Sequence, residues 1–223
     1  KFKKLNKGVF VIKILKNYLS HDQSWNLACA ADGTPAHWWS KAIKHNKTAK
    51  PIMMNNNIGG YRQEYGASHH ITNSVNSNDF TYKFSRSTNH VKGCGCWECT
   101  FKKEVLESEK FKDVIRKNTS LENPVLYETF TSAYYPGDFL GRHTDEKRGV
   151  AFIFNLSWDW KPEYGGILNI ENGDTWISYV PGWGDLVLLE LGETGKLHFV
   201  SEVSSFAPRP RLAISGWYND AES

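Results

Sequence analysis

The stretch YYPGDFLGRHTD, residues 134–145, ends in the pattern His143-Thr144-Asp145. On a β-strand, alternate side chains point to the same face. His143 and Asp145 would then project together, with Cα atoms about 6–7 Å apart, while Thr144 faces away. An imidazole and a carboxylate placed in this way can bind one metal ion, so the stretch marks a candidate metal site.

A third ligand for this site is available in His198, which lies in a late predicted strand, LHFVSEV at residues 197–203. Two histidines and one carboxylate form the facial triad, which holds Fe(II) on one side and leaves three coordination positions open. Taken alone, His198 could equally be a hydrogen-bonded histidine of the core. The joint pattern of the three residues favours the metal site.

The last predicted strand supplies a cation, Arg211, on the same face as three smaller or aromatic positions, Ala213, Ser215 and Trp217. A buried arginine requires a partner, and a ligand carboxylate can satisfy it through paired charge-assisted hydrogen bonds. The alternative is a structural ion pair with an acid of the protein. Arg209 is a nearby second candidate, but Pro210 makes its segment a less regular strand.

The fold class is predicted from the pattern of apolar segments and turn residues in the second half of the chain. Short apolar segments alternate with Pro-Gly, Gly-Gly and Asn-Gly turns, and the 9 Trp, 10 Tyr and 12 Phe residues favour sheets. The predicted strands cover residues 126–134, 150–156, 166–170, 175–180, 185–191, 197–203 and 211–217. We therefore expect a mainly β protein with flanking helices, a double-stranded β-helix (jelly roll) whose N-terminal helices support one sheet.

The 223 residues suit one domain, with helical support and irregular loops over 1–124 and the jelly-roll core over 125–223. The first half predicts a strand over 8–19, a helix from Ser20 to about Ala31 and a short helix over 36–44. Ser20 and Gln23 form a capping-box pattern. One broken helix or two short ones follow over 101–117, with Ser108 as an internal cap.

The turn-rich segment 45–87 is too long for an ordinary connection in a compact domain. We expect a short strand near residues 80–84. The remainder is either a lid over the substrate or a packed irregular insertion.

Charge and hydropathy indicate which partners and which cellular compartment to expect for this protein. The net charge is +3, with acidic and basic residues interleaved, so no clear nucleic-acid-binding stripe is present. No apolar run approaches the roughly 20 residues that span a bilayer, and the Lys-rich start lacks the apolar core of a signal peptide. We expect a soluble, cytoplasmic protein without a membrane partner.

The four cysteines, Cys29, Cys94, Cys96 and Cys99, fit a reduced compartment better than a disulfide framework. His90 precedes the last three, and His90, Cys94, Cys96 and Cys99 could supply the four nitrogen and sulfur ligands of a structural zinc ion. The alternative is a loop of free thiols packed beside Trp97.

Several of these segments together resemble a known family. They are His143-Thr144-Asp145, residues 159–168, residues 181–190, residues 198–203 and residues 211–218. They resemble the prolyl 4-hydroxylase-like branch of the Fe(II)/2-oxoglutarate dioxygenases, and most closely the ribosomal prolyl hydroxylase type. The resemblance covers roughly residues 130–219.

The resemblance implies roles for individual residues. His143, Asp145 and His198 would bind the iron, and Arg211 would anchor the distal carboxylate of 2-oxoglutarate. Tyr135 matches an aromatic residue beside the metal pocket. Asn155 aligns where many relatives place a tyrosine that assists the cosubstrate, and here it could donate one hydrogen bond instead. The spacing between His198 and Arg211 is wider than in close relatives, with 206–210 as the extension.

The function implied is hydroxylation of an unactivated C–H bond, most plausibly of a prolyl residue in a protein or peptide, with succinate and CO₂ as coproducts. Fe(II), 2-oxoglutarate and O₂ would be required, with ascorbate as a supporting reductant. Asp145 favours hydroxylation, because related halogenases have a small residue there. Three alternatives remain: a hydroxylase of a free amino acid or other small molecule, a metal-binding jelly roll that does not use 2-oxoglutarate, and a catalytically silent binding module.

Overall fold

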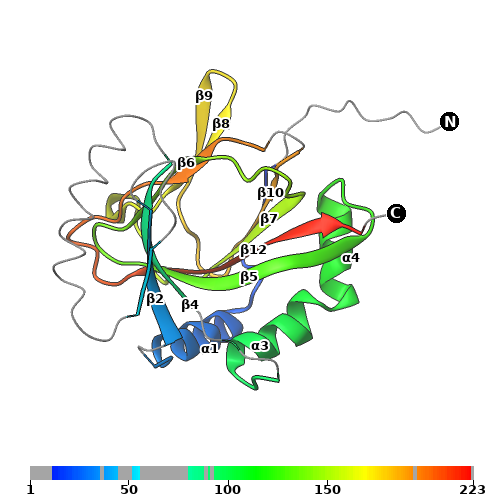
Figure 1. The fold of residues 1–223 in the computed structure, drawn as a ribbon, viewed down its shortest axis with the longest axis horizontal. Helices are drawn as coiled ribbons and strands as arrows, with labels where there is room; N and C mark the ends of the chain where they lie inside the picture. Colours follow the sequence, from blue (N-terminus) through cyan, green and yellow to red (C-terminus); the bar gives the residue numbers. More distant parts are fainter. Residues whose placement is uncertain are drawn as a thin grey trace.

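The computed structural model describes residues 12–35, 38–44, 80–87, 90, 93–192 and 195–221, and the backbone of 52–55. Figure 1 shows strands that curl into an open barrel, with the helices along one side. All pairings between the strands are antiparallel. The strands are β1 (Ile12–Leu15), β2 (Trp39–Lys44), β3 (Ile52–Asn55), β4 (Tyr82–Ser87), β5 (Pro124–Tyr134), β6 (Phe139–His143), β7 (Val150–Asn155), β8 (Leu168–Asn172), β9 (Thr175–Tyr179), β10 (Leu186–Glu190), β11 (His198–Val200) and β12 (Arg211–Asp220).

The hydrogen-bonded strands follow the order β1-β10-β7-β12-β5-β4-β6-β11-β8-β9. Strand β4 joins the two sides of the barrel, because Ser85 pairs with Ala133 of β5 and Tyr82 pairs with Leu140 of β6. This arrangement is the predicted jelly roll, and seven of its strands match the segments expected from the sequence to within a few residues.

The helices cover the outer face of β7, β10 and β12. They are α1 (His21–Asp32), α3 (Trp97–Phe101), the π-helical turn η2 (Lys102–Leu106) and α4 (Glu109–Asn118). Phe152 and Phe154 of β7 join the cluster around Phe111 of α4, whereas the intervening residues face the barrel. Because both faces are covered, these strands are apolar without strict alternation.

The predicted helix boundaries at Ser20 and Ser108 are confirmed. The Ser20 hydroxyl accepts from the backbone of Gln23 at 3.2 Å, and the Gln23 side chain accepts from the backbone of Ser20 at 2.9 Å. Ser108 caps α4 by accepting from the Phe111 N–H. The helical half thus consists of two pieces separated at Ser108, as the interrupted pattern indicated.

The predicted helix over 36–44 is wrong, because its described part is strand β2. Ser40 pairs with Asn55 of β3 on one side and with Arg86 of β4 on the other. A six-residue segment is too short for periodicity to separate helix from strand, and pairing with distant strands decides the outcome.

Two further expectations need adjustment. The first strand covers only Ile12–Leu15. Residues 8–11 of the predicted strand over 8–19 lie outside the described residues. Within 45–87 the structure contains β3 and β4, so the first half of the chain contributes strands as well as helices. Residues 45–51 and 56–79, and with them the predicted lid, lie outside the described residues.

The register between β12 and β5 shifts once. Trp217 pairs with Glu128, whereas Tyr218 pairs with Leu126, so Tyr127 has no residue opposite it in the ladder. Tyr127 exposes 54% of its surface, and the Arg148 guanidinium lies 3.7 Å from the centre of its ring. The shift is a β-bulge at the edge of the barrel.

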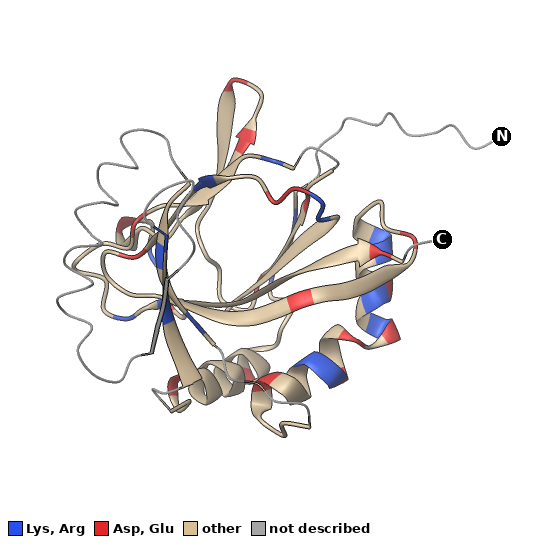
Figure 2. Ribbon diagram, viewed as in Figure 1, with Lys and Arg blue, Asp and Glu red and all other residues tan. Residues whose placement is uncertain are grey.

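Charged residues of both signs are interspersed along α4 (Figure 2). Arg116 lies 2.6 Å from Asp113 and 3.1 Å from Glu109, and Lys112 lies 2.8 Å from Glu109. None of the helices in the described ranges is long and apolar enough to cross a membrane.

The contact between α4 and the sheet can be tested by replacing Phe111, which is 1% exposed and packs on Phe152, Phe154 and Tyr218. Phe111→Ala should lower the free energy of unfolding by about 3–5 kcal/mol, because it removes a ring and leaves a cavity. Urea titration measures the change. Lys110→Ala, at an exposed position of the same helix, should alter stability by less than about 0.5 kcal/mol. Equal effects of the two variants would contradict this packing.

Candidate functional site

His143 and Asp145, two positions apart, meet the distant His198 between β6, β11 and β12. His143 ends β6, His198 begins β11, and the two residues are direct partners in the ladder. Asp145 lies just beyond β6, in a segment that is no longer a strand. One ligand atom from each lies within 4.8 Å of the others, so the three residues could hold one metal ion.

The two imidazoles are oriented by backbone carbonyls. His143 Nδ1 lies 2.9 Å from the Gly141 carbonyl oxygen, and His198 Nδ1 lies 2.6 Å from that of Lys196. A carbonyl can only accept, so each ring carries its proton on Nδ1. Both Nε2 atoms then turn toward Asp145, at 3.4 Å from His143 and 3.5 Å from His198, with unprotonated lone pairs suited to a metal.

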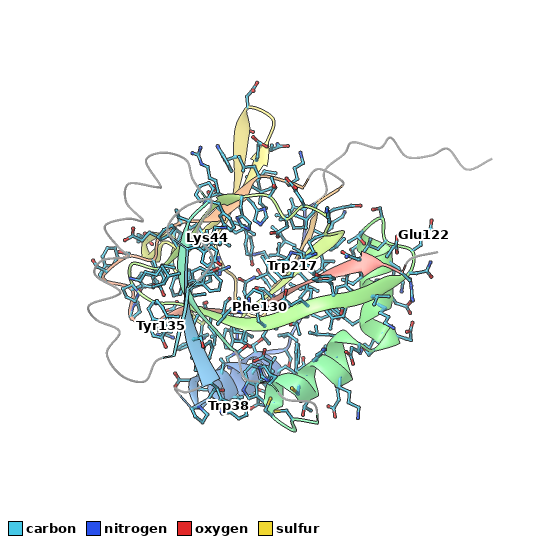
Figure 3. All side chains as sticks on the ribbon, viewed as in Figure 1. Trp38, Lys44, Glu122, Phe130, Tyr135 and Trp217 are labelled. Atoms are coloured by element: carbon cyan, nitrogen blue, oxygen red, sulfur yellow. The ribbon has the colours of Figure 1, made fainter. Side chains whose placement is uncertain are left out.

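The Asp145 carboxylate is also held from the opposite side of the barrel. The Trp217 indole N–H of β12 donates to Asp145 Oδ2 at 2.9 Å, and Trp217 lies inside the open barrel in Figure 3. Burial acts to raise the pKa of Asp145, but the close contacts with the His143 and His198 rings outweigh it and lower the pKa. The carboxylate therefore stays ionised, as a metal ligand must.

The environment of His143 favours the neutral ring. Burial lowers its pKa, with a further contribution from the nearby His198 ring, whose centroid is 4.2 Å away. Phe80 stacks on the other face of His143 at a centroid distance of 4.7 Å. A neutral, rigidly packed imidazole is ready to bind a metal without first losing a proton.

Arg211, the first residue of β12, is 2% exposed. In the part of the chain that the structure describes, no carboxylate lies within 4.0 Å of its guanidinium, and its Nε has no hydrogen-bond partner. Burial lowers the pKa of Arg211. A buried cation without an anion is costly, so this geometry indicates a site for an anionic ligand.

The Gly165-Gly166 turn leaves room for this arginine. Gly166 has φ +61°, and a Cβ there would lie 2.8 Å from Arg211 Cδ. A Cβ on Gly165 would lie only 2.0 Å from the Glu202 carbonyl oxygen. Glycine is needed at both positions because the backbone approaches its neighbours too closely for a side chain.

Two tyrosines that sequence reasoning missed lie beside Arg211. Tyr134 is its partner across the β5–β12 ladder, with its ring centre 5.2 Å from the guanidinium, and burial raises the pKa of Tyr134 to about 12. Tyr179 also interacts electrostatically with Arg211, and burial raises its pKa. Both phenols stay protonated, and the Tyr179 hydroxyl donates to Asp185 Oδ2 at 2.7 Å. The pairing of residue 134 with residue 211 was the signal for Tyr134, but it required the strand register.

Asn155 is fully buried at the end of β7. Its Nδ2 lies 3.5 Å from the Tyr179 hydroxyl and 3.5 Å from the Asp185 carbonyl oxygen. Its Oδ1 has no partner among the described residues. The amide thus lies beside one of the two tyrosines that flank Arg211, and its predicted contact with a cosubstrate stays a prediction.

Tyr135 is the residue that follows β5. It exposes 47% of its surface, its ring lies 5.4 Å from Lys41 Nζ, and in Figure 3 it is well separated from Trp217. Adjacent residues of a strand point to opposite faces, so Tyr134 rather than Tyr135 faces Arg211. Its predicted place beside the metal pocket stays a prediction.

The turn between β5 and β6 is fixed by Asp138, another residue not singled out from the sequence. Asp138 is fully buried and accepts from Lys41 Nζ at 2.5 Å and from the Tyr135 N–H at 2.9 Å. The backbones of Gly137 and Asp138 both pair with Val203, beyond β11. These contacts hold β6, and hence His143, in place.

Residues 129–219 match the family described as the 2OG-Fe(II) oxygenase superfamily, and this range contains the three candidate ligands and Arg211. Over these residues the chain is similar to the 2OG-Fe(II) oxygenase superfamily. The match supports assignment of the chain as a 2-oxoglutarate-dependent dioxygenase, a class that uses Fe(II), 2-oxoglutarate and O₂.

Solved structures share the fold of this oxygenase. A prolyl-4-hydroxylase from Pseudomonas putida superposes with a TM-score of 0.59 at 17% identity, covering 95% of this chain and 94% of that one. A Trichoplax adhaerens prolyl hydroxylase, solved with a peptide fragment of hypoxia inducible factor, gives 0.58 at 16% identity, covering 94% and 83%. A Burkholderia pseudomallei oxidoreductase of the 2OG-Fe(II) oxygenase family gives 0.51 at 11% identity, covering 93% and 84%. No curated protein matches the sequence.

The residues of this oxygenase fit the groups that the family implies. Two imidazoles and one carboxylate converge, with no lysine or arginine side chain paired to Asp145 among the described contacts. This is a ligand set for Fe(II). Arg211, which is buried and has no acid partner among the described residues, fits an anionic cosubstrate.

A ligand role for Arg211 predicts an unusual effect on stability. Arg211→Met should raise the free energy of unfolding of the ligand-free oxygenase by about 1 kcal/mol or more, because it removes an uncompensated buried charge at similar volume. Chemical denaturation in the absence of 2-oxoglutarate measures the change. Arg86→Met, which breaks a 2.9 Å ion pair with Glu128, should be neutral or mildly destabilising. A loss of several kcal/mol in Arg211→Met would instead indicate a structural ion pair.

Proposed function

We propose that this oxygenase hydroxylates a prolyl residue in a protein or peptide, with succinate and CO₂ as coproducts. The observation that carries the proposal is the pairing of a three-ligand metal pocket with a buried arginine that has no acid partner in the described structure. The peptide-bound relative from Trichoplax adhaerens supports a peptide substrate on this fold.

His143, Asp145 and His198 would hold Fe(II). When bound, Fe(II) supplies O₂ activation coupled to the oxidative decarboxylation of 2-oxoglutarate. The protein's contribution is positioning: the carbonyls of Gly141 and Lys196 fix the rings, and Trp217 fixes the carboxylate. These contacts would hold the three ligands in place before Fe(II) binds.

Arg211 would bind the distal carboxylate of 2-oxoglutarate with paired, charge-assisted hydrogen bonds. The hydroxyl of Tyr134 is available as an additional donor, since its proton is retained up to a pKa of about 12. Tyr134 interacts electrostatically with both Arg211 and Asp145. Water is excluded there because Arg211 and Tyr134 are both buried.

The substrate would approach along an aromatic surface next to Asp145. Trp217 lies 5.8 Å from Phe130 between ring centroids, and Arg148 lies between Trp217 and the exposed Tyr127. Phe130 and Trp217 are close neighbours in Figure 3. Aromatic faces suit the apolar pyrrolidine ring of proline, and Arg86 and Arg148 can meet polar groups of a peptide backbone.

The substrate class is tested with purified protein, Fe(II), ascorbate, 2-oxoglutarate and a library of proline-containing peptides. We expect peptide-stimulated succinate and a mass gain of one oxygen on proline, and no turnover in Asp145→Ala because an iron ligand is lost. Matched peptides with alanine in place of proline are the control. Stimulation by free proline alone would favour the small-molecule alternative, and oxygen on another residue would replace the prolyl assignment.

The role of Arg211 in cosubstrate binding is tested separately. Arg211→Met should weaken 2-oxoglutarate binding by at least about 30-fold, corresponding to the roughly 2 kcal/mol or more lost when a buried charge pair is truncated. The Fe(II)- and 2-oxoglutarate-dependent absorption change, followed without O₂, measures the affinity. Arg209→Met, two positions away and exposed, should leave the affinity unchanged. Equal affinities in the two variants would reject Arg211 as the anchor, and absence of the absorption change in the unsubstituted protein would favour a metal protein that does not use 2-oxoglutarate.

A further inference from the structure

A second group of potential metal ligands lies outside the segment that matches the oxygenase family. His90, Cys94, Cys96 and Cys99 come together where the chain enters α3, and one ligand atom from each lies within 4.8 Å of the others. All the cysteines are free thiols. The predicted four-ligand set is therefore brought together in space.

The spacing of the ligand atoms suits a single tetrahedral ion. His90 Nδ1 lies 3.4 Å from Cys96 Sγ and 3.5 Å from Cys99 Sγ. Zinc–sulfur and zinc–nitrogen bonds of about 2.3 and 2.0 Å place tetrahedral ligands about 3.5–3.8 Å apart. The Cys99 N–H also points at Cys96 Sγ at 3.5 Å, a contact that stabilises negative charge on that sulfur.

The free nitrogen of His90 faces an acid that belongs to the protein core. His90 Nε2 lies 3.4 Å from Glu98 Oε2, and the Glu98 side chain is only 7% exposed. Glu98 Oε1 accepts from the Ser87 hydroxyl at 2.8 Å and from the Thr131 N–H at 3.2 Å. A histidine between a metal and a carboxylate is the usual way in which an outer contact fixes the ring and strengthens the ligand.

We propose that His90, Cys94, Cys96 and Cys99 bind one structural Zn²⁺, which fastens the segment before α3 to strands β4 and β5. Three thiolates and one imidazole fill all four positions of a tetrahedral zinc ion and leave none open for a substrate. The soft sulfur ligands select zinc over the hard cations Mg²⁺ and Ca²⁺. Binding displaces the thiol protons to solvent.

The position of Glu98 indicates what the ion would stabilise. Ser87 ends β4, the strand that joins the two sides of the barrel, and Thr131 lies in the middle of β5. The zinc would thus support the barrel through a series of contacts that runs from His90 to Glu98 and from Glu98 to Ser87. It would act on the structure rather than in the oxygenase reaction.

The first experiment measures metal content after saturation with Zn²⁺ and gel filtration. It uses a His143→Ala/Asp145→Ala background, which removes the candidate iron site. We expect one zinc per chain in this background, the same in Cys29→Ser, and none in Cys94→Ser or Cys99→Ser. Cys29, the remaining cysteine, lies exposed on α1 and is the matched control. Unchanged zinc in the Cys94 and Cys99 variants, or iron in place of zinc on the unsubstituted cluster, would overturn the proposal.

A second measurement leaves all four cluster residues unchanged, so it is not affected if a cluster variant fails to fold. Co²⁺ added to the same background with Cys29→Ser should give intense thiolate-to-cobalt absorption in the near-ultraviolet, which Zn²⁺ then displaces. Absence of this absorption rules out thiolate ligation. Glu98→Gln should retain the absorption but weaken zinc binding by about 10–100-fold. These readouts are independent of 2-oxoglutarate turnover, so they hold whether or not the proposed hydroxylation is observed.

Discussion

The Asp145 carboxylate connects the two sides of the barrel. Its oxygens face His143 of β6 and His198 of β11 on one side and accept from Trp217 of β12 on the other. No single strand could build this site. Its geometry depends on closure of the jelly roll, which in turn depends on β4 pairing with both β5 and β6. The protein core and the candidate metal pocket are therefore aspects of the same set of strand pairings.

Arg211 shows the opposite relation between site and stability. Its burial with no acid partner among the described residues works against folding, whereas Gly165, Gly166 and Tyr134 shape the space around it. A protein retains such an arrangement where the missing anion arrives as a ligand. The stability of the barrel must therefore come from elsewhere, chiefly from the aromatic layer between α4 and the strands β7, β10 and β12.

The extent to which the sequence predicts this molecule follows from the range of the interactions. Ser20 and Ser108 were predictable as caps because their partners lie three residues away. The metal-ligand candidates were recognisable because the residue types themselves carry the chemistry. Strand β2 was not predictable in this way, because its conformation is set by pairing with β3 and β4. The surroundings of Arg211 and the burial of Asp138 likewise depend on which residues of distant strands become neighbours.

The bulge at Tyr127 gives β5 two phases of alternation. Beyond it, Phe130 and Tyr134, at even positions, face the barrel interior, yet Leu126, also even, packs against the helix layer. The extra residue thus reverses which parity points inward, and it does so at the edge of the proposed substrate surface. If this one residue were deleted, β5 would keep a single alternation, and either its contacts with the helix layer or its contacts in the barrel interior would be lost. The length of β5, rather than any side chain within it, keeps both.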